Sequence, residues 1–206
     1  MNAAALRDDL EPLRRYVRAM TALVGATTDE ARLLGEGREL LAALLAGDDW
    51  LPAAFATPSA ERYVQYLLHC DPLERFSVVS FVWQPGQATP VHDHTVWGLV
   101  GQLRGAERCE EYAADGERVV ATGRTHVMER GAIDAVSPTI GDWHRVSNAT
   151  RDRTAISIHV YGANIGAVRR HRLDAQGAIR DFVSGYDSPV TPNLWDRAAA
   201  VRAGTC

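Results

Sequence analysis

The apolar residues of this chain change their spacing near residue 76, and that change limits the folds open to it. Between residues 6 and 45, apolar side chains recur every three or four positions, with a break at residues 27–29, where Thr or Asp can cap a second helix. From Phe76 onward the chain consists of short runs rich in valine, isoleucine and aromatic residues, most of them separated by Gly, Pro, Asn or Asp. Two helices followed by many short strands predict a mainly β fold, a barrel with N-terminal α-helices.

The segments outside these patterns are less regular. Residues 48–59 contain two prolines and predict a loop, and residues 62–69 fit either a short helix or an extended arm. After residue 181 the chain has two more prolines and a tryptophan. We expect this tail to be irregular before a last helical turn or two, and to wrap around the outside of the barrel.

Length and composition set the class of protein. Nothing in the 206 residues marks a second domain, so we predict a single domain with a helical cap to about residue 60, a barrel over about 61–186 and a tail over 187–206. A net charge of -4 gives no electrostatic case for binding nucleic acid. The N-terminal segment carries acids and arginines throughout, which predicts neither a signal peptide nor a membrane span.

The three cysteines are widely spaced. Cys70, Cys109 and Cys206 include no C-x-x-C pair, which argues against a disulfide framework and against a zinc site built from several thiolates. Reduced thiols and the absence of a targeting signal favour the cytoplasm. A protein of this class has small molecules as its expected partners.

Three histidines indicate a metal site. His92 and His94 are two residues apart, so on a strand they would share a face, with Cβ atoms roughly 6–7 Å apart, and both imidazoles could reach one ion. His144 follows a turn signal at residues 141–142 and precedes a second one at residues 147–148, and we expect it to bring the third ligand from another strand. An H-x-H pair by itself is more often a surface or core feature than a metal site.

The residues around these histidines resemble the two cupin motifs. The matching residues are Gly86, His92, His94 and Gly105 in the first motif, and Gly141, His144 and Asn148 in the second. The resemblance implies a jelly-roll-like cupin barrel. It departs from the usual motif at Gly98, where a glutamate ligand is expected. Three neutral imidazoles would leave a divalent ion with its full charge and about three open positions, enough for an anionic substrate and dioxygen.

Together with the run SIHVYGANIG at residues 157–166, these features resemble the cysteine dioxygenase family of non-haem iron thiol dioxygenases. The resemblance covers roughly residues 63–186 and implies Fe(2+) bound by His92, His94 and His144. The ligand set alone suits zinc equally well, and zinc in such a site would activate water.

A polar alternation in the same run implies further site residues. Ser157, His159 and Tyr161 lie at i, i+2 and i+4 of a predicted strand, so they project to one face and can form a hydrogen-bonded relay. Such alternation is usually no more than the polar face of a strand, but here it matches the family's Ser-His-Tyr triad. In animal members a cysteine crosslinks to this tyrosine. The matching position is Gly98, so we expect no thioether, and Cys109 lies too far along the chain to replace it.

The residue that binds the substrate carboxylate decides which thiol fits. Family members that act on cysteine use an arginine two residues after a tyrosine, whereas this chain has Tyr63 followed by Gln65, which cannot form a bidentate ion pair. This departure resembles the 3-mercaptopropionate dioxygenase branch, in which an arginine from elsewhere binds the carboxylate. Arg170 is our candidate; its neighbour Arg169 is the alternative, and a solvated arginine is the plain interpretation.

The other histidines and the tryptophans carry no clear signal. His69, His126 and His171 lack partners at a useful spacing, so we expect surface or structural roles. The tryptophans near the motifs are more typical of barrel packing than of substrate contacts. They are Trp83, Trp97 and Trp143.

The sequence therefore predicts an iron(II) thiol dioxygenase that oxidises a small thiol carboxylate to its sulfinic acid with both atoms of dioxygen. The first candidate substrate is 3-mercaptopropionate. Cysteine and mercaptosuccinate are alternative substrates. Two other classes stay open: a zinc-dependent cupin hydrolase or lyase, and a non-catalytic cupin that binds a small ligand. The oligomeric state is not predicted.

Overall fold

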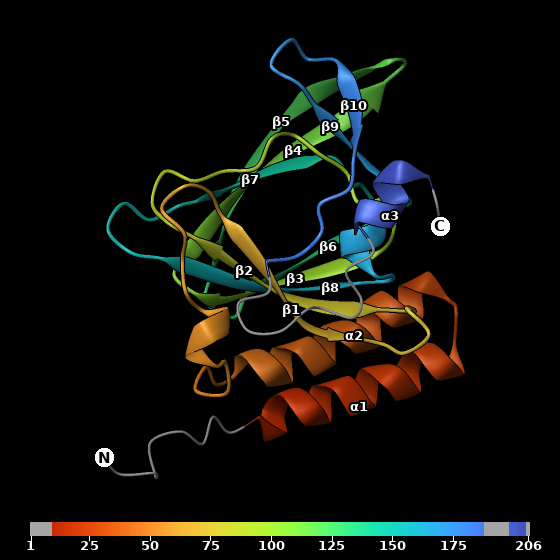
Figure 1. Cartoon of the computed structure of the whole chain (residues 1–206), viewed down its shortest axis with the longest axis vertical. Helices are drawn as coiled ribbons and strands as arrows, with labels where there is room; N and C mark the ends of the chain where they lie inside the picture. The colour runs from red at the N-terminus through yellow and green to blue at the C-terminus, as the bar shows by residue number, and fades with distance from the viewer. Residues whose placement is uncertain (1–9, 188–197, 205–206) are drawn as a thin grey trace.

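The structure is a computed structural model and describes residues 10–187 and 198–204 (Figure 1). Its helical elements are α1 (Glu11–Ala26), α2 (Glu30–Leu45), η2 (Ala53–Phe55), η3 (Ile165–Ala167) and α3 (Ala198–Ala203). Its strands are β1 (Val64–Cys70), β2 (Ser77–Trp83), β3 (Gly98–Arg104), β4 (Ala106–Asp115), β5 (Arg118–Glu129), β6 (Ile133–Val136), β7 (His144–Asn148), β8 (Ala155–Tyr161), β9 (Arg170–Leu173) and β10 (Ile179–Phe182). This confirms the predicted fold class, mainly β with two N-terminal helices.

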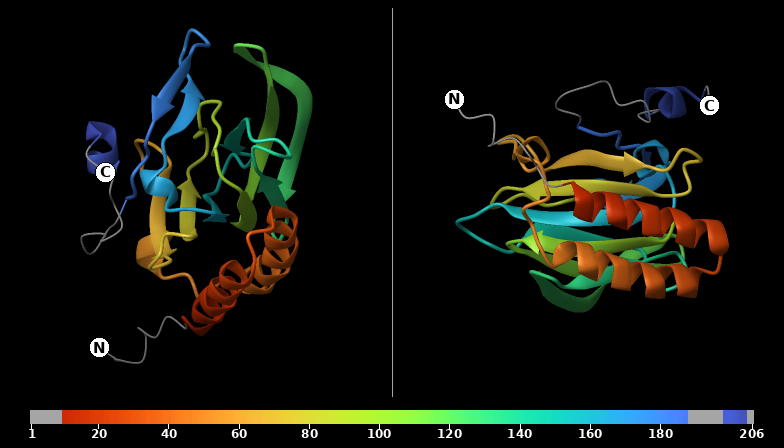
Figure 2. Two further views of the ribbon diagram at one scale, coloured as in Figure 1. Left: turned by 90° about the vertical axis from the view of Figure 1, so that its right-hand side faces the viewer. Right: turned by 90° about the horizontal axis from the view of Figure 1, so that it is seen from below.

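The strands form three sheets. A five-stranded sheet has the order β1-β2-β8-β3-β6, a three-stranded sheet has the order β5-β4-β7, and β9 pairs with β10. The two helices lie together against the outer face of the five-stranded sheet, and the β4–β5–β7 sheet lies on its other side (Figures 1 and 2). Bridges from His92 to His144 and to Arg172 connect the remaining edges. The space between the sheets is the interior of the barrel.

The second helix begins where its sequence predicts. Asp29 caps α2 by accepting a hydrogen bond of 2.7 Å from the backbone N–H of Arg32, as expected from the break at residues 27–29. In α1 the first described helical residue is Glu11, and Pro12 stands in its first turn. The part of the predicted helix before residue 10 lies outside the described residues. Among the described helices, none is long and apolar enough to cross a membrane.

Strand β8 is buried on both faces: the side chains of one face pack in the core, and those of the other belong to the site. Ile156, Ile158 and Val160 belong to the apolar core beneath the helices. The alternate residues of the strand face the barrel interior, because successive side chains of a strand point to opposite faces. The helical cap therefore covers one face of the five-stranded sheet and leaves the other face to the site.

Of the two structures predicted for residues 62–69, a short helix or an extended arm, the extended one is found: most of these residues belong to β1, which pairs with β2. The segment of the first histidine pair differs from its predicted structure. His92 and His94 lie in a loop rather than on a strand, because Thr95 takes a left-handed φ of 60° and the carboxylate of Asp142 accepts the N–H groups of His94 and Thr95 at 2.8–3.0 Å. Hydrogen bonds to the Asp142 side chain thus take the place of strand pairing at His94 and Thr95.

The turn predicted at residues 147–148 begins only after residue 148. Both residues still belong to β7, and the turn follows Asn148, whose side chain accepts the Thr150 N–H at 2.8 Å and donates to the Trp83 carbonyl at 3.0 Å. Asn148 therefore has a structural part in joining β7 to β2.

The described parts of the C-terminal tail are held by hydrogen bonds. Asp187 accepts the Gln65 N–H at 3.0 Å and donates its own N–H to the Gln65 carbonyl at 2.8 Å. In α3, Arg202 donates to the Val183 carbonyl at 2.6 Å. The predicted irregular stretch with its two prolines lies outside the described residues.

Candidate metal centre

The three predicted ligand histidines lie together and are buried. The ring centroids of His92, His94 and His144 form a nearly equilateral triangle with sides of 4.9, 4.8 and 4.9 Å. One ring nitrogen of each lies within 4.8 Å of the other two, and all three side chains are buried. His94 and His92 come from the capped loop, and His144 is the first residue of β7.

Contacts on the outer sides of the rings orient them. His94 Nδ1 lies 2.8 Å from the Asp142 carboxylate, His92 Nδ1 lies 3.1 Å from the Pro90 carbonyl, and His144 Nδ1 lies 3.6 Å from the sulfur of Cys109. In each ring this leaves Nε2 as the atom that can bind an ion. Acceptors on the far nitrogen set the tautomer and the orientation of a histidine ligand.

Burial keeps the three imidazoles neutral. Desolvation lowers the pKa of His92 and His94 well below the usual value, and the pKa of His144 to about 4. Neutral imidazole is the form that binds a metal, and a set of three nitrogen donors suits a divalent iron, zinc, copper or nickel ion. The donor set therefore fits a divalent transition metal.

Gly98 explains the missing fourth ligand. It pairs with Tyr161 across β3 and β8, and a Cβ atom added at Gly98 would lie 2.7 Å from the Tyr161 ring. The tyrosine ring therefore occupies the space that a side chain at position 98 would need. Neither a carboxylate ligand nor a crosslinking cysteine fits there without movement of the ring.

The relay residues are brought together on the inner face of β8. The Ser157 hydroxyl lies 2.8 Å from His159 Nε2, and His159 Nδ1 lies 2.7 Å from the Tyr161 hydroxyl. The Tyr161 ring stacks beside His94 at 5.2 Å between centroids. Burial raises the pKa of Tyr161, so its hydroxyl keeps its proton at neutral pH.

A cavity of about 250 Å³ joins the relay to the metal centre. His92 and His144 of the metal centre and His159 and Tyr161 of the relay all line it. The described residues that line it include three arginines and no Asp or Glu. An anion of small size therefore matches the cavity.

The structure separates the two arginine candidates. Arg170 is buried and lines the cavity, with Nη2 donating to Ser184 at 2.6 Å and its guanidinium 4.6 Å above the Phe182 ring. Its Nε is buried without a hydrogen-bond partner among the described residues. Arg169 is exposed and pairs with Asp181 at 3.6 Å. Burial lowers the pKa of Arg170 from its high ordinary value, and the guanidinium remains charged.

Gln65 also lines the cavity, but one of its two polar ends is engaged. Its side-chain Nε2 donates to the Gly185 carbonyl at 2.7 Å, and the side chain is 8% exposed. The amide therefore fixes the segment that follows β10 against β1. Nε2 keeps a second N–H donor and the side-chain oxygen is an acceptor, so a contact between Gln65 and the substrate stays a prediction.

Two further residues of the site escaped the sequence analysis. Trp83 lines the cavity and its Nε1 lies 3.4 Å from the Ser157 hydroxyl, in addition to the packing role expected of it. Glu107 is completely buried on β4, and its pKa is raised to about 8 by desolvation, which Ser157, Gln102 and Trp83 partly offset. Because β2 is buried on both faces, its sequence does not show that Trp83 faces the site, and no local signal marks Glu107.

Two of the remaining histidines, for which surface or structural roles are expected, have carboxylate partners that are distant in the sequence. His171 Nδ1 lies 2.7 Å from Asp93, and His126 Nε2 lies 2.5 Å from Asp134. Both partners come from other elements, which sequence spacing does not reveal. His69 packs beside Phe76, at 5.4 Å between ring centroids.

Trp97 and Trp143 differ in their surroundings. Trp97 packs at the edge of the core under the helices, as expected of a packing residue. Trp143 stacks 6.3 Å from His171 and lines a second cavity of about 700 Å³. Cys109 lines that second cavity as well.

A barrel with three buried, oriented imidazoles defines a metal-binding cupin. The family model for cysteine dioxygenase type I matches residues 39–173, and the chain belongs to this family. Membership places it among metal-dependent oxidoreductases that act on a thiol and dioxygen.

Solved structures with similar folds come from several bacteria. A protein with a double-stranded β-helix domain from Klebsiella pneumoniae has 17% identity and a TM-score of 0.43, and the match covers 53% of this chain and 79% of that one. An RmlC-like cupin protein from Desulfovibrio desulfuricans has 25% identity, a TM-score of 0.38 and coverage of 52% and 88%. TT1209 from Thermus thermophilus has 20% identity, a TM-score of 0.42 and coverage of 53% and 90%.

Proposed function

We propose that this protein is an iron(II) thiol dioxygenase that converts 3-mercaptopropionate to its sulfinic acid, with both oxygen atoms coming from dioxygen. The observation that carries the proposal is the pairing of a buried arginine, Arg170, with three histidines around one small cavity. A thiol carboxylate has one group for each end of that cavity. Iron(II) bound by the imidazoles would supply the positions for thiolate and dioxygen, and the thiol sulfur would supply the four electrons that reduce dioxygen as the sulfinic acid forms.

Arg170 is the residue that we propose to bind the carboxylate. Its Nε is a buried donor without a partner among the described residues, and such a donor costs about 1–3 kcal/mol. A substrate carboxylate would satisfy it and form a charge-assisted hydrogen bond. Ser184 holds the other side of the guanidinium at 2.6 Å and so restricts its orientation.

The charges of the cavity favour a thiol without an amine. The described lining residues include Arg62, Arg170 and Arg172 and no acid, so an ammonium group would be desolvated next to cations without an anionic partner. Cysteine carries such a group and 3-mercaptopropionate does not. The exposed Arg172 supports mercaptosuccinate as a second candidate, because that thiol has a further carboxylate.

The relay has a preferred direction. The indole N–H of Trp83 can only donate, so the Ser157 oxygen accepts from it and is able to donate its own proton to His159 Nε2. His159 Nδ1–H then donates to the Tyr161 oxygen, and the Tyr161 O–H is available to the cavity. On this proposal Tyr161 donates a hydrogen bond to the bound substrate or oxygen, and Ser157 and His159 position it.

The first experiment measures oxygen consumption by protein loaded with iron under anaerobic conditions. 3-Mercaptopropionate, L-cysteine and mercaptosuccinate are supplied in parallel, and product masses are recorded. We expect fastest uptake with 3-mercaptopropionate and a mass gain of two oxygen atoms on one thiol. No uptake with any thiol at full iron occupancy would reject the dioxygenase proposal, and metal analysis together with hydrolase assays of the zinc form would then test the zinc-dependent alternative.

A further inference from the structure

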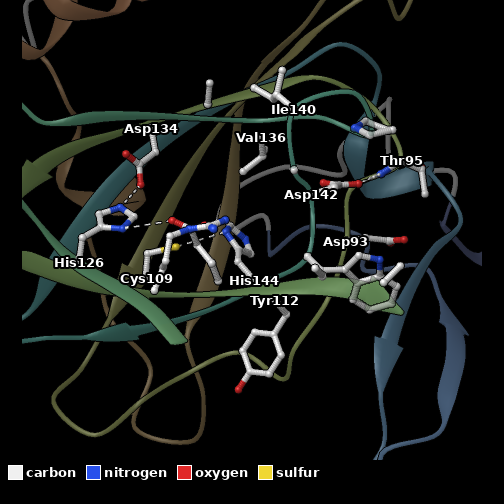
Figure 3. A pocket seen from close by; sticks show the side chains of 18 residues that line it. Asp93, Thr95, Cys109, Tyr112, His126, Asp134, Val136, Ile140, Asp142 and His144 are labelled. Atoms are coloured by element: carbon white, nitrogen blue, oxygen red, sulfur yellow. Dashed lines mark hydrogen bonds and ion pairs between the residues drawn. The ribbon is translucent and has the colours of Figure 1, made fainter. Parts of the chain in front are cut away.

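A second cluster of metal-binding side chains lies on the outer side of His144, away from the relay. Cys109, His126 and Asp134 each offer one donor atom within 4.8 Å of the other two (Figure 3). They line the cavity of about 700 Å³, separate from the smaller cavity that holds the relay. This cluster includes both a histidine and a cysteine that the proposed reaction does not use.

The strand register brings these residues together. Cys109 and His126 are direct partners in the antiparallel pair of β4 and β5, so their side chains lie on the same face. Asp134 comes from β6, and its carboxylate lies 2.5 Å from His126 Nε2. Glu111 follows Cys109 by two residues on the same face of β4 and lies 4.0 Å from His126 Nδ1.

The donors are chemically suited to zinc. One sulfur, one imidazole nitrogen and one or two carboxylate oxygens form a set that zinc binds tetrahedrally, with bonds of about 2.0–2.3 Å. Such bonds place donors about 3.3–3.8 Å apart. His126 Nε2 and Asp134, which are 2.5 Å apart in their hydrogen bond, would have to separate by about 1 Å, and Cys109, whose donor lies within 4.8 Å of both, would have to adjust around the ion. The side chains of His126 and Asp134 are 41% and 31% exposed, which leaves them free to make this movement from the open cavity.

The charge around the cluster favours a cation. Burial first, and then the carboxylates of Asp134, Glu111, Glu107 and Glu110, raise the pKa of the Cys109 thiol, so a metal ion binds this sulfur by displacing its proton. Arg124 pairs with Glu111 at 2.6 Å and Arg145 with Glu110 at 3.4 Å, so these two carboxylates are partly neutralised. Asp134 has a histidine as its partner and is the carboxylate that a cation would engage first.

We propose that Cys109, His126 and Asp134 bind a second divalent metal ion of the zinc type, apart from the three-histidine centre. Glu111 or water completes the coordination. Because the Cys109 sulfur also lies 3.6 Å from His144 Nδ1, an ion on this sulfur changes the group that faces a ligand of the first centre. Occupancy of the second site therefore alters the rate of the first site.

The test uses full-length protein already loaded with iron, titrated under anaerobic conditions with Co²⁺ and, in parallel, with Zn²⁺. We expect a near-ultraviolet charge-transfer band from thiolate to cobalt, and one zinc ion per chain bound in addition to one iron. The three-histidine centre has no sulfur ligand, so this band reports the second site alone.

Matched variants identify the residues. Cys109→Ser is expected to abolish the band, and Cys70→Ser, which alters the buried cysteine of β1, to leave it unchanged. His126→Ala changes a half-exposed side chain and is expected to lose the additional zinc while retaining iron. It therefore tests the site even if the Cys109 variant fails to fold. The proposal is overturned if no metal binds beyond the iron, or if the band persists in Cys109→Ser. Neither readout depends on thiol oxidation, so failure of the proposed function would be seen separately.

Discussion

At the scale of the residue, neighbours decide what each polar side chain can do. Arg169 and Arg170 are adjacent and chemically identical, yet Arg169 is exposed whereas Arg170 is buried in the cavity wall, against the Phe182 ring. Position 98 shows the same principle, because the Tyr161 ring fills the space of an absent side chain. Such differences arise from packing and cannot be seen in the residue type.

Replacement of Arg170 tests the carboxylate proposal. Loss of a charge-assisted hydrogen bond costs about 1.5–3 kcal/mol, so Arg170→Gln is expected to lower kcat/KM for 3-mercaptopropionate by roughly 10- to 150-fold. The matched control, Arg169→Gln, should change it less than twofold. For a thiol without a carboxylate, such as ethanethiol, kcat/KM should change little with either substitution. An equal loss with ethanethiol would mean that Arg170 acts through structure.

Glu107 predicts a pH dependence of stability. Its pKa is about 8 in the folded protein against an ordinary value of 4.5, so the folded state holds a proton that the unfolded chain releases. The contribution of protonated Glu107 to the free energy of unfolding is therefore fully present below pH 4.5. It falls by about 1.4 kcal/mol for each pH unit up to about pH 8. Glu107→Gln should remove this fall.

Denaturant unfolding of the Glu107 variant at several pH values provides the measurement. We expect Glu107→Gln to gain stability over the natural protein at pH 9 and to differ little from it at pH 4. Glu129→Gln, at an exposed position of β5, is the control and should show no such divergence. Parallel curves for the Glu107 variant and the natural protein would contradict the prediction.

At the scale of the element, helix α2 and strand β3 approach each other closely through glycines. A Cβ atom at Gly101 would lie 2.5 Å from a methyl group of Leu45, and one at Gly37 would lie 3.0 Å from a methyl group of Leu99. Since β3 also pairs with β8, this close contact supports the strand that holds the relay. The cap therefore stabilises the site from behind.

Substitution of Gly101 measures this contact. Overpacking typically costs about 1–3 kcal/mol, so Gly101→Ala should lower the free energy of unfolding by about that amount. The control is Gly35→Ala in α2, where an added Cβ meets nothing within 4 Å, and it should stabilise by about 0.5–1 kcal/mol. Thermal and denaturant unfolding of both variants show whether each substitution raises or lowers the free energy of unfolding. A neutral Gly101 variant would show that the helix moves outward at little cost.

At the scale of the whole molecule, the metal centre joins distant parts of the chain. His92 and His94 come from a loop, His144 from β7, and bridges from His92 reach β7 and β9. An ion bound by these residues stabilises the folded state alone, by RT ln(1 + [M]/Kd) for free metal M. Metal binding is thus expected to stabilise the barrel as a unit.

Metal removal tests that expectation. At a free metal concentration 100 times Kd, the linkage is about 2.7 kcal/mol, so chelation should lower Tm by several degrees. His144→Ala should lose both iron and activity, and its Tm should no longer respond to a chelator. Retention of stoichiometric iron by that variant would show that His144 is not a ligand.

Several features of the fold and site could be predicted from the sequence. The change of apolar spacing near residue 76 indicates helices before strands, because the two periods bury different sets of residues. The same period of two places Ser157, His159 and Tyr161 on one face of β8. Asp29 could be predicted as a cap, because capping depends on contacts within a few residues.

Tertiary structure alone decided the features that depend on residues far apart in the chain. Asp142 caps the histidine loop from 48 positions away, and it places His94 without the strand that the spacing suggested. Asp134 reaches His126, and Cys109 reaches His144, through strand pairing and sheet packing. The selection of Arg170 over Arg169 likewise follows from burial. Local patterns determine local conformation, whereas the contacts of a site depend on how the sheets close around it.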